Sequence, residues 1–303
     1  MKNQIIQGDC LSVLKTLPSD SVDMVMTSPP YWALRDYGVP GQLGLEPTFQ
    51  EYIAKLCDIF DEIRRVLKKE GTCWVNMGDT YFNSPTGKHT EFKGVISEQT
   101  FNAQMEHGKN IDYSKISLST KCLLQIPNRF AIEMTNRGWI LRNEIIWHKP
   151  NCMPSSIKDR FTVDFEKLFF FTKSKKYYFE TQSEPLKTPF HGKDWETRKK
   201  EGDAMRAGTG KPYKCLGGSP DGRNKRTVWT IATKPYKETH FATYPEALCE
   251  IPIKAGCPMG GIVLDPFFGA GTTGLVAKKL GRNYLGIELN GDYIKIAEQR
   301  LTP

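Results

Sequence analysis

The stretch GIVLDPFFGAGTTGLVAKKLGRNYLGIEL, residues 261–289, has the pattern of a strand, a glycine loop, a helix and a second strand. Gly269, Gly271 and Gly274 stand in a G-x-G-x-x-G spacing, where glycines allow a tight turn and the helix N-terminus presents free N–H groups. Glu288 follows at the tip of the second strand, where an acidic side chain accepts ribose hydroxyls. By itself this pattern also fits a nicotinamide or flavin dinucleotide site.

Segments of the same two kinds alternate along most of the chain. Hydrophobic periodicity and glycine stops predict helices over 11–17, 48–71, 122–138, 244–256, 271–281 and 291–301. Short apolar runs predict strands over 3–10, 21–27, 72–79, 139–149, 261–267 and 282–289. Residues 166–173 and 176–180 are expected to form a hairpin or consecutive edge strands. Strands that alternate with helices predict an α/β fold with a doubly wound, mostly parallel sheet.

Length and composition are those of an ordinary globular protein. A chain of 303 residues can bury one large core, or one core with an appended smaller region. No apolar run reaches the roughly 18 residues of a membrane span, and the N-terminus lacks a secretory signal, so we expect a cytoplasmic protein with no membrane partner. The eight cysteines form no Cys-x-x-Cys pair and the five histidines are scattered, which indicates buried thiols and no metal site.

The net charge of +8 is concentrated in one segment. Residues 187–237 contain 13 Lys/Arg and 5 Asp/Glu, so this segment alone carries a net charge of +8. A basic block with interspersed aromatic residues indicates a polyanionic partner, with nucleic acid the first expectation. A solvated surface loop without a partner is the alternative.

The stretch MTSPPYW, residues 26–32, ends the predicted strand over 21–27. Two consecutive prolines donate no backbone hydrogen bonds and fix φ, so the strand must end there. The prolines form a rigid corner with outward-facing carbonyl oxygens, the Ser28 hydroxyl before it and two aromatic rings after it. Such a corner is suited to a flat ligand that donates hydrogen bonds.

Together, DPFFGAGTT, TSPPYW and GIEL resemble motifs of the amino-methyltransferases of DNA, which methylate exocyclic nitrogens of adenine or cytosine. The order of the motifs resembles the beta subgroup, whose sheet is circularly permuted. The resemblance implies S-adenosylmethionine as cofactor and the fold of the methyltransferases that use it. It also implies a catalytic part over 1–180 with a loop insertion at 82–120, a basic target-recognition region over 181–228, and a cofactor-binding part over 229–303.

The resemblance implies a set of cofactor-binding residues in these motifs. The glycine loop and the ribose-binding strand supply several of them. The stretches QGDC, residues 7–10, and HFATYPEAL, residues 240–248, supply others. Asp9 of QGDC matches the acidic residue that contacts the adenine amine, although a helix N-cap is a compatible alternative. The expected set is Asp9, Cys10, Thr27, Phe241, Asp265, Pro266, Phe267, Gly269, Gly271, Thr272 and Glu288.

The expected catalytic residues are Ser28, Pro29, Pro30 and Tyr31. The serine hydroxyl and the main-chain carbonyls would accept hydrogen bonds from an exocyclic amine, and Tyr31 would stack on a base that has left the duplex. In the resembling family serine before the prolines is typical of cytosine-N4 enzymes, and Asp or Asn of adenine-N6 enzymes. The sequence therefore favours N4 of cytosine, with N6 of adenine as the alternative.

DNA, expected to be double-stranded, is the implied partner. Trp32, Arg35, Lys149 and Asn151 are the predicted substrate or DNA contacts, with Trp32 either extending the base stack or packing beneath it. A companion restriction endonuclease is compatible with the resemblance, and the sequence leaves the oligomeric state open. A DNA-binding module with a vestigial cofactor site is the competing hypothesis from another class.

Overall fold

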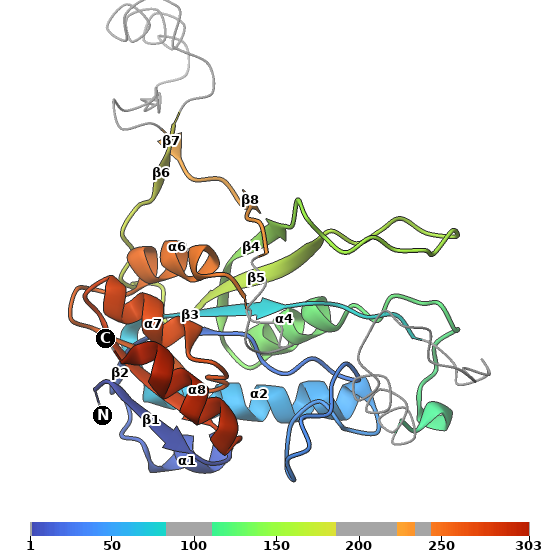
Figure 1. Ribbon diagram of the computed structural model, residues 1–303, viewed down its shortest axis with the longest axis horizontal. Helices are drawn as coiled ribbons and strands as arrows, with labels where there is room; N and C mark the ends of the chain where they lie inside the picture. Colours follow the sequence, from blue (N-terminus) through green and yellow to red (C-terminus); the bar gives the residue numbers. More distant parts are fainter. Residues whose placement is uncertain (1, 83–110, 186–222, 234–243, 303) are drawn as a thin grey trace, which may run out of the picture. The chain divides into compact units, whose positions relative to one another are not determined.

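The computed structural model describes residues 2–82, 111–185, 223–233 and 244–302 (Figure 1). Eight strands form one sheet in the order β1-β10-β9-β2-β3-β5-β4-β8. Their bounds are β1 Gln4–Gln7, β2 Val22–Thr27, β3 Leu67–Met77, β4 Ile140–His148, β5 Phe165–Thr172, β8 Val228–Thr230, β9 Ile262–Asp265 and β10 Asn283–Glu288. Neighbours pair in parallel except that β5 is antiparallel to both β3 and β4. The predicted α/β fold with a mostly parallel sheet is confirmed.

The sheet is circularly permuted in the way that the motif order implied. Strands β9 and β10 come from the C-terminal part of the chain and lie between β1 and β2 from the N-terminal part. This arrangement places the glycine loop, which follows β9, beside the Ser-Pro-Pro corner, which follows β2. Because β4 runs parallel to β2, β3, β9 and β10, the carboxyl ends of all these strands lie at one edge of the sheet. The start of the reversed strand β5 lies at the same edge.

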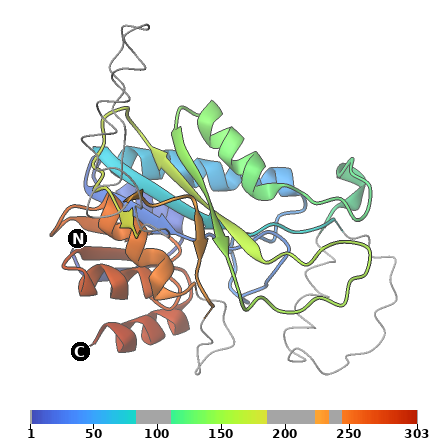
Figure 2. The same cartoon turned by 90° about the horizontal axis from the view of Figure 1, so that it is seen from above.

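Helices cover both faces of the sheet (Figure 2). They are α1 Cys10–Thr16, α2 Phe49–Val66, α4 Ile126–Asn136, α6 Glu246–Gly256, α7 Thr272–Lys279 and α8 Gly291–Leu301, with a 3-10 turn, η2, at Tyr113–Lys115. Buried residues of α1, α2 and α4 belong to one hydrophobic cluster, and those of α6, α7 and α8 belong to a second. None of the helices within the described ranges combines the length and apolar character needed to cross a bilayer.

Successive side chains along a strand point to opposite faces of the sheet, so one strand contributes residues to both clusters. On β5, Phe169 and Phe171 face the first cluster, whereas Leu168 and Phe170 face the second. All four side chains are buried, so β5 presents apolar residues on both faces, as expected of a strand inside a sheet. The Phe170 ring stacks on Trp74 of β3 with centroids 4.1 Å apart.

Two predicted elements were wrong in their extent or place. The helix predicted over 48–71 ends at Val66, because from Leu67 onward the chain joins the sheet and pairs with Val22 of β2. Tertiary pairing here overrides the helical propensity of the Leu-Lys-Lys-Glu run. Neither the hairpin nor the consecutive edge strands predicted for 166–173 and 176–180 form within the described chain, since β5 lies between β3 and β4 and residues 176–180 form no strand.

The chain divides into two compact units. The larger contains Met1–Glu180 and Thr227–Pro303 and holds the eight-stranded sheet; the smaller is Thr181–Arg226. In the smaller unit β6 (Ser183–Glu184) pairs antiparallel with β7 (Arg223–Asn224), and Glu184 accepts hydrogen bonds from Arg223 and Arg226, each at 2.8 Å. Most of the insertion predicted at 82–120 and of the basic region predicted at 181–228 lies outside the described residues, so their roles stay predictions.

Candidate active site

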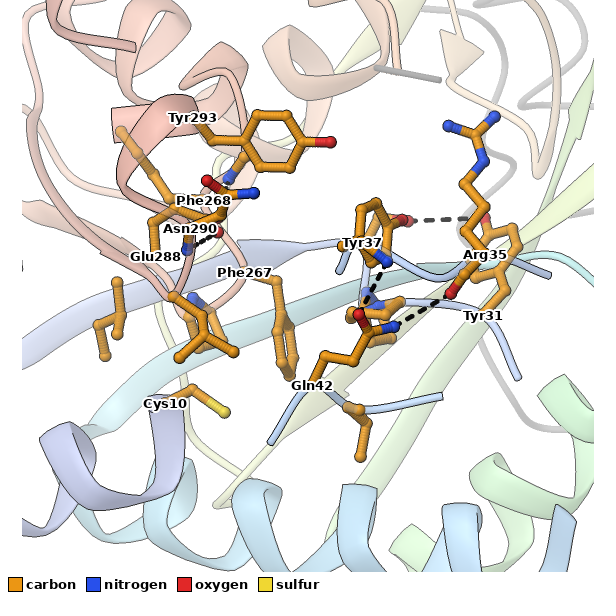
Figure 3. A pocket seen from close by; sticks show the side chains of 18 of the residues that line it. Cys10, Tyr31, Arg35, Tyr37, Gln42, Phe267, Phe268, Glu288, Asn290 and Tyr293 are labelled. Carbon is orange, nitrogen blue, oxygen red and sulfur yellow. Dashed lines mark hydrogen bonds between the residues drawn. The ribbon is translucent and has the colours of Figure 1, made fainter. Parts of the chain in front are cut away.

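A cavity of about 770 Å³ lies at the carboxyl edge of the sheet. Its lining comes from the segments that follow β1, β2, β9 and β10, and from the ends of β3, β4 and β5. In Figure 3, Glu288, Asn290 and Phe267 mark one part of the cavity, and Tyr31 and Arg35 mark another. In open α/β sheets ligands bind in this position, outside the carboxyl ends of the strands.

The glycine loop and the end of β10 form the first part of the cavity. Gly269 and Gly271 have φ values of +51° and +76°, which favour glycine, and α7 begins directly after Gly271. A Cβ at Gly271 would lie 2.9 Å from the Cβ of Ala297, so the loop packs tightly on α8. Glu288 accepts hydrogen bonds from the backbone N–H of Gly269 at 2.7 Å and of Asn290 at 2.8 Å, while burial raises its pKa. Its carboxylate is therefore fixed at the wall of the cavity.

The segment after β1 forms the neighbouring wall. Asp9 caps α1, because its carboxylate accepts from the Ser12 backbone N–H at 2.9 Å and from the Ser12 hydroxyl at 2.7 Å. Cys10 also lines the cavity, and burial raises the pKa of its thiol to about 12, so the thiol stays protonated. On the opposite side the Tyr37 ring meets Tyr293 edge-on, with centroids 6.2 Å apart.

Behind the cavity, Asp265 connects the glycine loop to the Ser-Pro-Pro corner. One carboxylate oxygen accepts from the Thr27 hydroxyl at 2.6 Å and from the Phe267 backbone N–H at 3.1 Å. The other accepts from the Thr273 hydroxyl at 2.6 Å and from the Tyr244 hydroxyl at 3.1 Å. The side chain is 1% exposed, and burial raises its pKa to about 6 against the lowering effect of these hydrogen bonds. Asp265 thus fixes β2, α7 and the start of α6 relative to one another.

The Ser-Pro-Pro corner forms the second part of the cavity. Tyr31 donates a hydrogen bond from its hydroxyl to Glu166 at 2.8 Å, and burial followed by the Glu166 charge raises its pKa. Among the described residues, the Ser28 hydroxyl makes one long contact, with the Tyr31 hydroxyl at 3.5 Å. Gly78 makes room for the tyrosine, since a Cβ there would lie 2.6 Å from Cε2 of Tyr31. The Pro30 carbonyl accepts from the Tyr52 hydroxyl at 2.8 Å, which anchors the corner to α2.

An ion pair closes this part of the cavity. Lys149, directly after β4, pairs with Glu166 at the start of β5, and both side chains are mostly buried. The Lys149 ammonium also lies 4.4 Å from the centroid of the Trp147 ring. Glu166 therefore holds a tyrosine hydroxyl with one oxygen and an ammonium with the other.

Most of the residues predicted from sequence lie in this cavity, whereas a few do not. Those that line it are Asp9, Cys10, Ser28, Pro29, Pro30, Tyr31, Arg35, Lys149, Pro266, Phe267, Gly269, Thr272 and Glu288. Three others, Thr27, Asp265 and Gly271, support the walls from behind. Phe241 lies outside the described residues.

Two predicted DNA contacts lie elsewhere. Trp32 is 3% exposed, donates from its indole N–H to the Glu46 carbonyl at 2.9 Å and meets Phe49 edge-on. Of the two options for this ring, the structure has it packed in the core beneath the corner. Asn151 is exposed, and its amide exchanges two hydrogen bonds of 2.9 Å with the backbone of Thr233, which joins the ends of β4 and β8.

Comparison with known proteins identifies the family. A family model described as DNA methylase, covering N6 and N4 methyltransferases, matches residues 22–299. The chain belongs to this family. It is 42% identical to the Type II methyltransferase M.Cfr9I of Citrobacter freundii over 98% of the chain and 87% of that protein, and 39% identical to M.SmaI of Serratia marcescens over 98% and 90%. The resemblance is confirmed, and the protein is a DNA methyltransferase.

Solved structures share the fold. The PvuII DNA methyltransferase, which is cytosine-N4-specific, superposes with a TM-score of 0.64 at 19% identity, over 100% of this chain and 87% of that one. A DNA modification methylase of Thermus thermophilus, solved in complex with S-adenosyl-L-methionine, gives 0.57 at 22% identity, over 99% and 94%. S-adenosylmethionine is the cofactor of this DNA methyltransferase. The cavity suits such a molecule, because Glu288 and Asp9 offer carboxylates and Phe267 offers an aromatic face around one end.

Sequence reasoning about this DNA methyltransferase missed several residues of the cavity. Asn76, Trp147 and Glu166 line its second part, and Tyr37 and Tyr293 line the first. Glu166 carried a usable signal, since it is an acidic residue two positions before the apolar run LFFF, residues 168–171. Its meaning depended on knowing that this strand runs antiparallel inside the sheet, which brings its first residues to the carboxyl edge.

Replacing Thr27 by Val removes one donor from Asp265 with little change in shape, and its cost should depend on pH. The folded-state pKa of about 6 lies above the ordinary value of 3.8, so ionisation of Asp265 costs stability as pH rises between these values. The hydrogen bond from Thr27 offsets more of that cost when the carboxylate is charged than when it is protonated. Thr27→Val should therefore lower the free energy of unfolding by roughly 1.5–3 kcal/mol at about pH 8, and by about 1 kcal/mol or less at about pH 5.

Denaturant unfolding at the two pH values measures this difference. Thr16→Val is the matched control, because the exposed Thr16 hydroxyl donates to the uncharged Val13 carbonyl and contacts no charged group within the described ranges. Its cost should be small and independent of pH. An equal cost of Thr27→Val at both pH values would contradict the role assigned to Asp265.

Proposed function

We propose that this DNA methyltransferase transfers the methyl group of S-adenosylmethionine to the exocyclic N4 of cytosine. The observation that carries the proposal is Ser28 at the head of the Ser-Pro-Pro-Tyr corner, with a hydroxyl that makes only one long contact to the described part of the chain. A hydroxyl is shorter than a carboxylate or an amide, so it sets the target amine at a different depth in the cavity. The serine is also the residue typical of N4 enzymes in the resembling family.

The cofactor end uses the residues around the glycine loop. When bound, S-adenosylmethionine supplies an electrophilic methyl group on a sulfonium centre. Glu288 is proposed to accept the ribose hydroxyls, since its carboxylate is already oriented by the Gly269 and Asn290 backbone N–H groups. Asp9 is proposed to accept from the adenine amine while it caps α1. Phe267 supplies an apolar face for the flat ring.

The base end activates a weak nucleophile. The lone pair of an exocyclic amine is delocalised into the base ring. If the Ser28 hydroxyl and the carbonyls of Ser28 and Pro29 accept hydrogen bonds from the amine, the nitrogen can pyramidalise and direct its lone pair toward the cofactor end. These acceptors also stabilise the positive charge that develops on the nitrogen, and they cost no reorganisation because Pro29 and Pro30 fix the corner.

Glu166 and Lys149 are proposed to hold the rest of the base pocket in place. Glu166 orients the Tyr31 ring, on which the base would stack, by accepting from its hydroxyl at 2.8 Å. Lys149 offers N–H donors beside the Trp147 ring, where they can reach ring acceptors such as N3 or O2 of cytosine. The Lys149–Glu166 pair keeps both charges compensated in a mostly buried position.

DNA must present the target base outside the helix for its amine to reach this cavity. Arg35, which lines the cavity in the loop after the corner, is a proposed phosphate or base contact. The basic region 181–228 is proposed to clamp the duplex and to read the recognition sequence through Arg and Lys side chains. Because the relatives in Citrobacter and Serratia are named Type II methyltransferases, a companion restriction endonuclease is a further proposed partner.

Mass spectrometry of nucleosides tests the proposed base. Duplex DNA of varied sequence is incubated with the protein and S-adenosylmethionine, then digested, and N4-methylcytosine is the expected product. Sequencing of the modified sites then defines the recognition sequence. N6-methyladenine would overturn the choice of base while leaving the methyltransferase activity in place.

Two substitutions should separate the two ends of the cavity. Ser28→Ala removes an acceptor needed in the transition state, so it should lower the single-turnover transfer rate by roughly 10²–10³-fold with little change in cofactor Kd. Glu288→Ala should raise the cofactor Kd by roughly 10–100-fold and leave the rate at saturating cofactor within a few-fold.

Calorimetric titration gives the Kd, and transfer of labelled methyl groups gives the rate. Glu298→Ala, an exposed glutamate on α8, is the matched control and should change neither quantity. Equal losses of affinity and rate in both variants would show that the division of roles is wrong.

A further inference from the structure

The connection between β4 and β5 carries an unusual number of exposed apolar side chains. Ten large hydrophobic residues are exposed in the described part of the chain, and five of them lie within residues 153–165. Phe161 is 96% exposed and Met153 is 77% exposed. Ile157 and Val163 also belong to the connection, and Phe165 is the first residue of β5. Single exposed hydrophobic residues need no explanation, but a cluster in one connection marks an interaction surface.

This connection starts and ends at the wall of the active site. Residues 150–164 begin directly after Lys149 and return directly before β5, on which Glu166 pairs with Trp147 in the register of the sheet. The Lys149 backbone N–H donates to the Asp164 carbonyl at 2.7 Å, which closes the base of the connection. Lys149, Trp147 and Glu166 all line the cavity. Whatever binds the exposed side chains therefore lies beside the mouth of the active site.

Contacts on both flanks hold the connection against the rest of the large unit. Asp159 forms an ion pair with Lys121 at 2.6 Å, and the Arg160 guanidinium lies 3.6 Å from the centroid of the Tyr81 ring. On the other flank, Asn151 exchanges two hydrogen bonds with Thr233. In Figures 1 and 2 the connection runs out from the sheet beyond the ends of β4 and β5. Each arm of the connection, about seven residues from its base to its tip, can reach roughly 20 Å from the base.

The position of the connection favours DNA as the partner of this surface. A duplex whose target base enters the cavity must lie across its mouth. The connection also carries the cations Lys158 and Arg160, next in sequence to Ile157 and Phe161, and Lys121 is joined to it by the ion pair with Asp159. Phe and Met are among the side chains that proteins insert between base pairs, where they replace lost stacking. A base that leaves the stack opens such a space and costs stacking and pairing energy.

We propose that residues 150–164 form a DNA wedge, in which Phe161 enters the base stack and stabilises the duplex with its target base extruded. The inference rests on the proposed extrusion of the base, and it assigns to this surface a role separate from cofactor binding and methyl transfer. Such a wedge should raise the rate of methylation when the target base is paired. It should have much less effect on that rate when the base is already unpaired.

The test compares Phe161→Ala with the unchanged protein on two duplexes that share the recognition sequence found by sequencing of methylated sites. In one the target base is paired, and in the other it faces a mismatch. Single-turnover methylation of the paired duplex should fall by about 10-fold or more, and that of the mismatched duplex by less than about 3-fold. Ile132→Ala, on α4 and 61% exposed, is the matched control and should change neither rate.

Fluorescence of 2-aminopurine placed next to the target base gives a second readout. The unchanged protein should raise this fluorescence on the paired duplex as the neighbouring base unstacks, and Phe161→Ala should reduce the rise. Equal rate losses on the two duplexes, or no loss, would overturn the wedge. A change of oligomeric mass in Phe161→Ala without any difference between the duplexes would also overturn it, because the surface would then bind a second copy. In each of these outcomes, methylation of the mismatched duplex by the unchanged protein would leave the proposed function standing.

Discussion

The buried carboxylate of Asp265 is the interaction on which the geometry of the active site depends. It accepts four hydrogen bonds, two on each oxygen, from a strand, a loop, and residues at the starts of two helices. A carboxylate in the core is costly unless it is fully hydrogen-bonded, so each of these donors is needed where it stands. Thr27 directly precedes Ser28, and Phe267 belongs to the glycine loop. The network therefore sets the distance between the part of the cavity formed by the glycine loop and the part formed by the Ser-Pro-Pro corner.

The order of strands makes this network possible. Circular permutation brings β9, near the C-terminus, next to β2, near the N-terminus, so two motifs far apart in the sequence become neighbours at one edge of the sheet. The reversed strand β5 then adds a residue that a purely parallel sheet would not supply at that edge. Glu166, its second residue, links Tyr31 of the corner with Lys149 of the adjacent strand. The second part of the cavity is thus built from β2, β3, β4 and β5 together.

Local patterns in the sequence were enough to predict the fold class, the glycine loop, the Ser-Pro-Pro corner and the cofactor. Each of these depends on residues adjacent in the chain, and the two motifs together are specific to the family. The residues that sequence reasoning missed depend on contacts across the sheet. Trp32 follows the motif directly, yet its ring turns into the core to reach the Glu46 carbonyl. Asp265 was expected among the cofactor contacts but acts behind the wall, because its partners come from four separate segments.

The boundary between α2 and β3 also depends on contacts across the sheet, which local sequence patterns do not reveal. Leu67 to Glu70 have helical character, but Leu67 pairs with Val22 of β2 and the strand resumes this pairing at Thr72. Likewise the run EKLFFFTK indicates a strand, but its place between β3 and β4 follows from long-range pairing. The motif residues that line the cavity were therefore easier to predict than the residues that orient them.

A double-mutant cycle on Thr27→Val and Thr273→Val tests whether Asp265 couples the two parts of the cavity, because each substitution removes one donor from a different oxygen of Asp265. The quantity measured is the single-turnover rate of methyl transfer at saturating cofactor, for the unchanged protein, the two single variants and the double variant. If Asp265 couples the two parts of the cavity, the two effects should deviate from additivity by more than about 0.5 kcal/mol. Effects that add within that margin would contradict coupling through Asp265, since the two hydroxyls would then act independently.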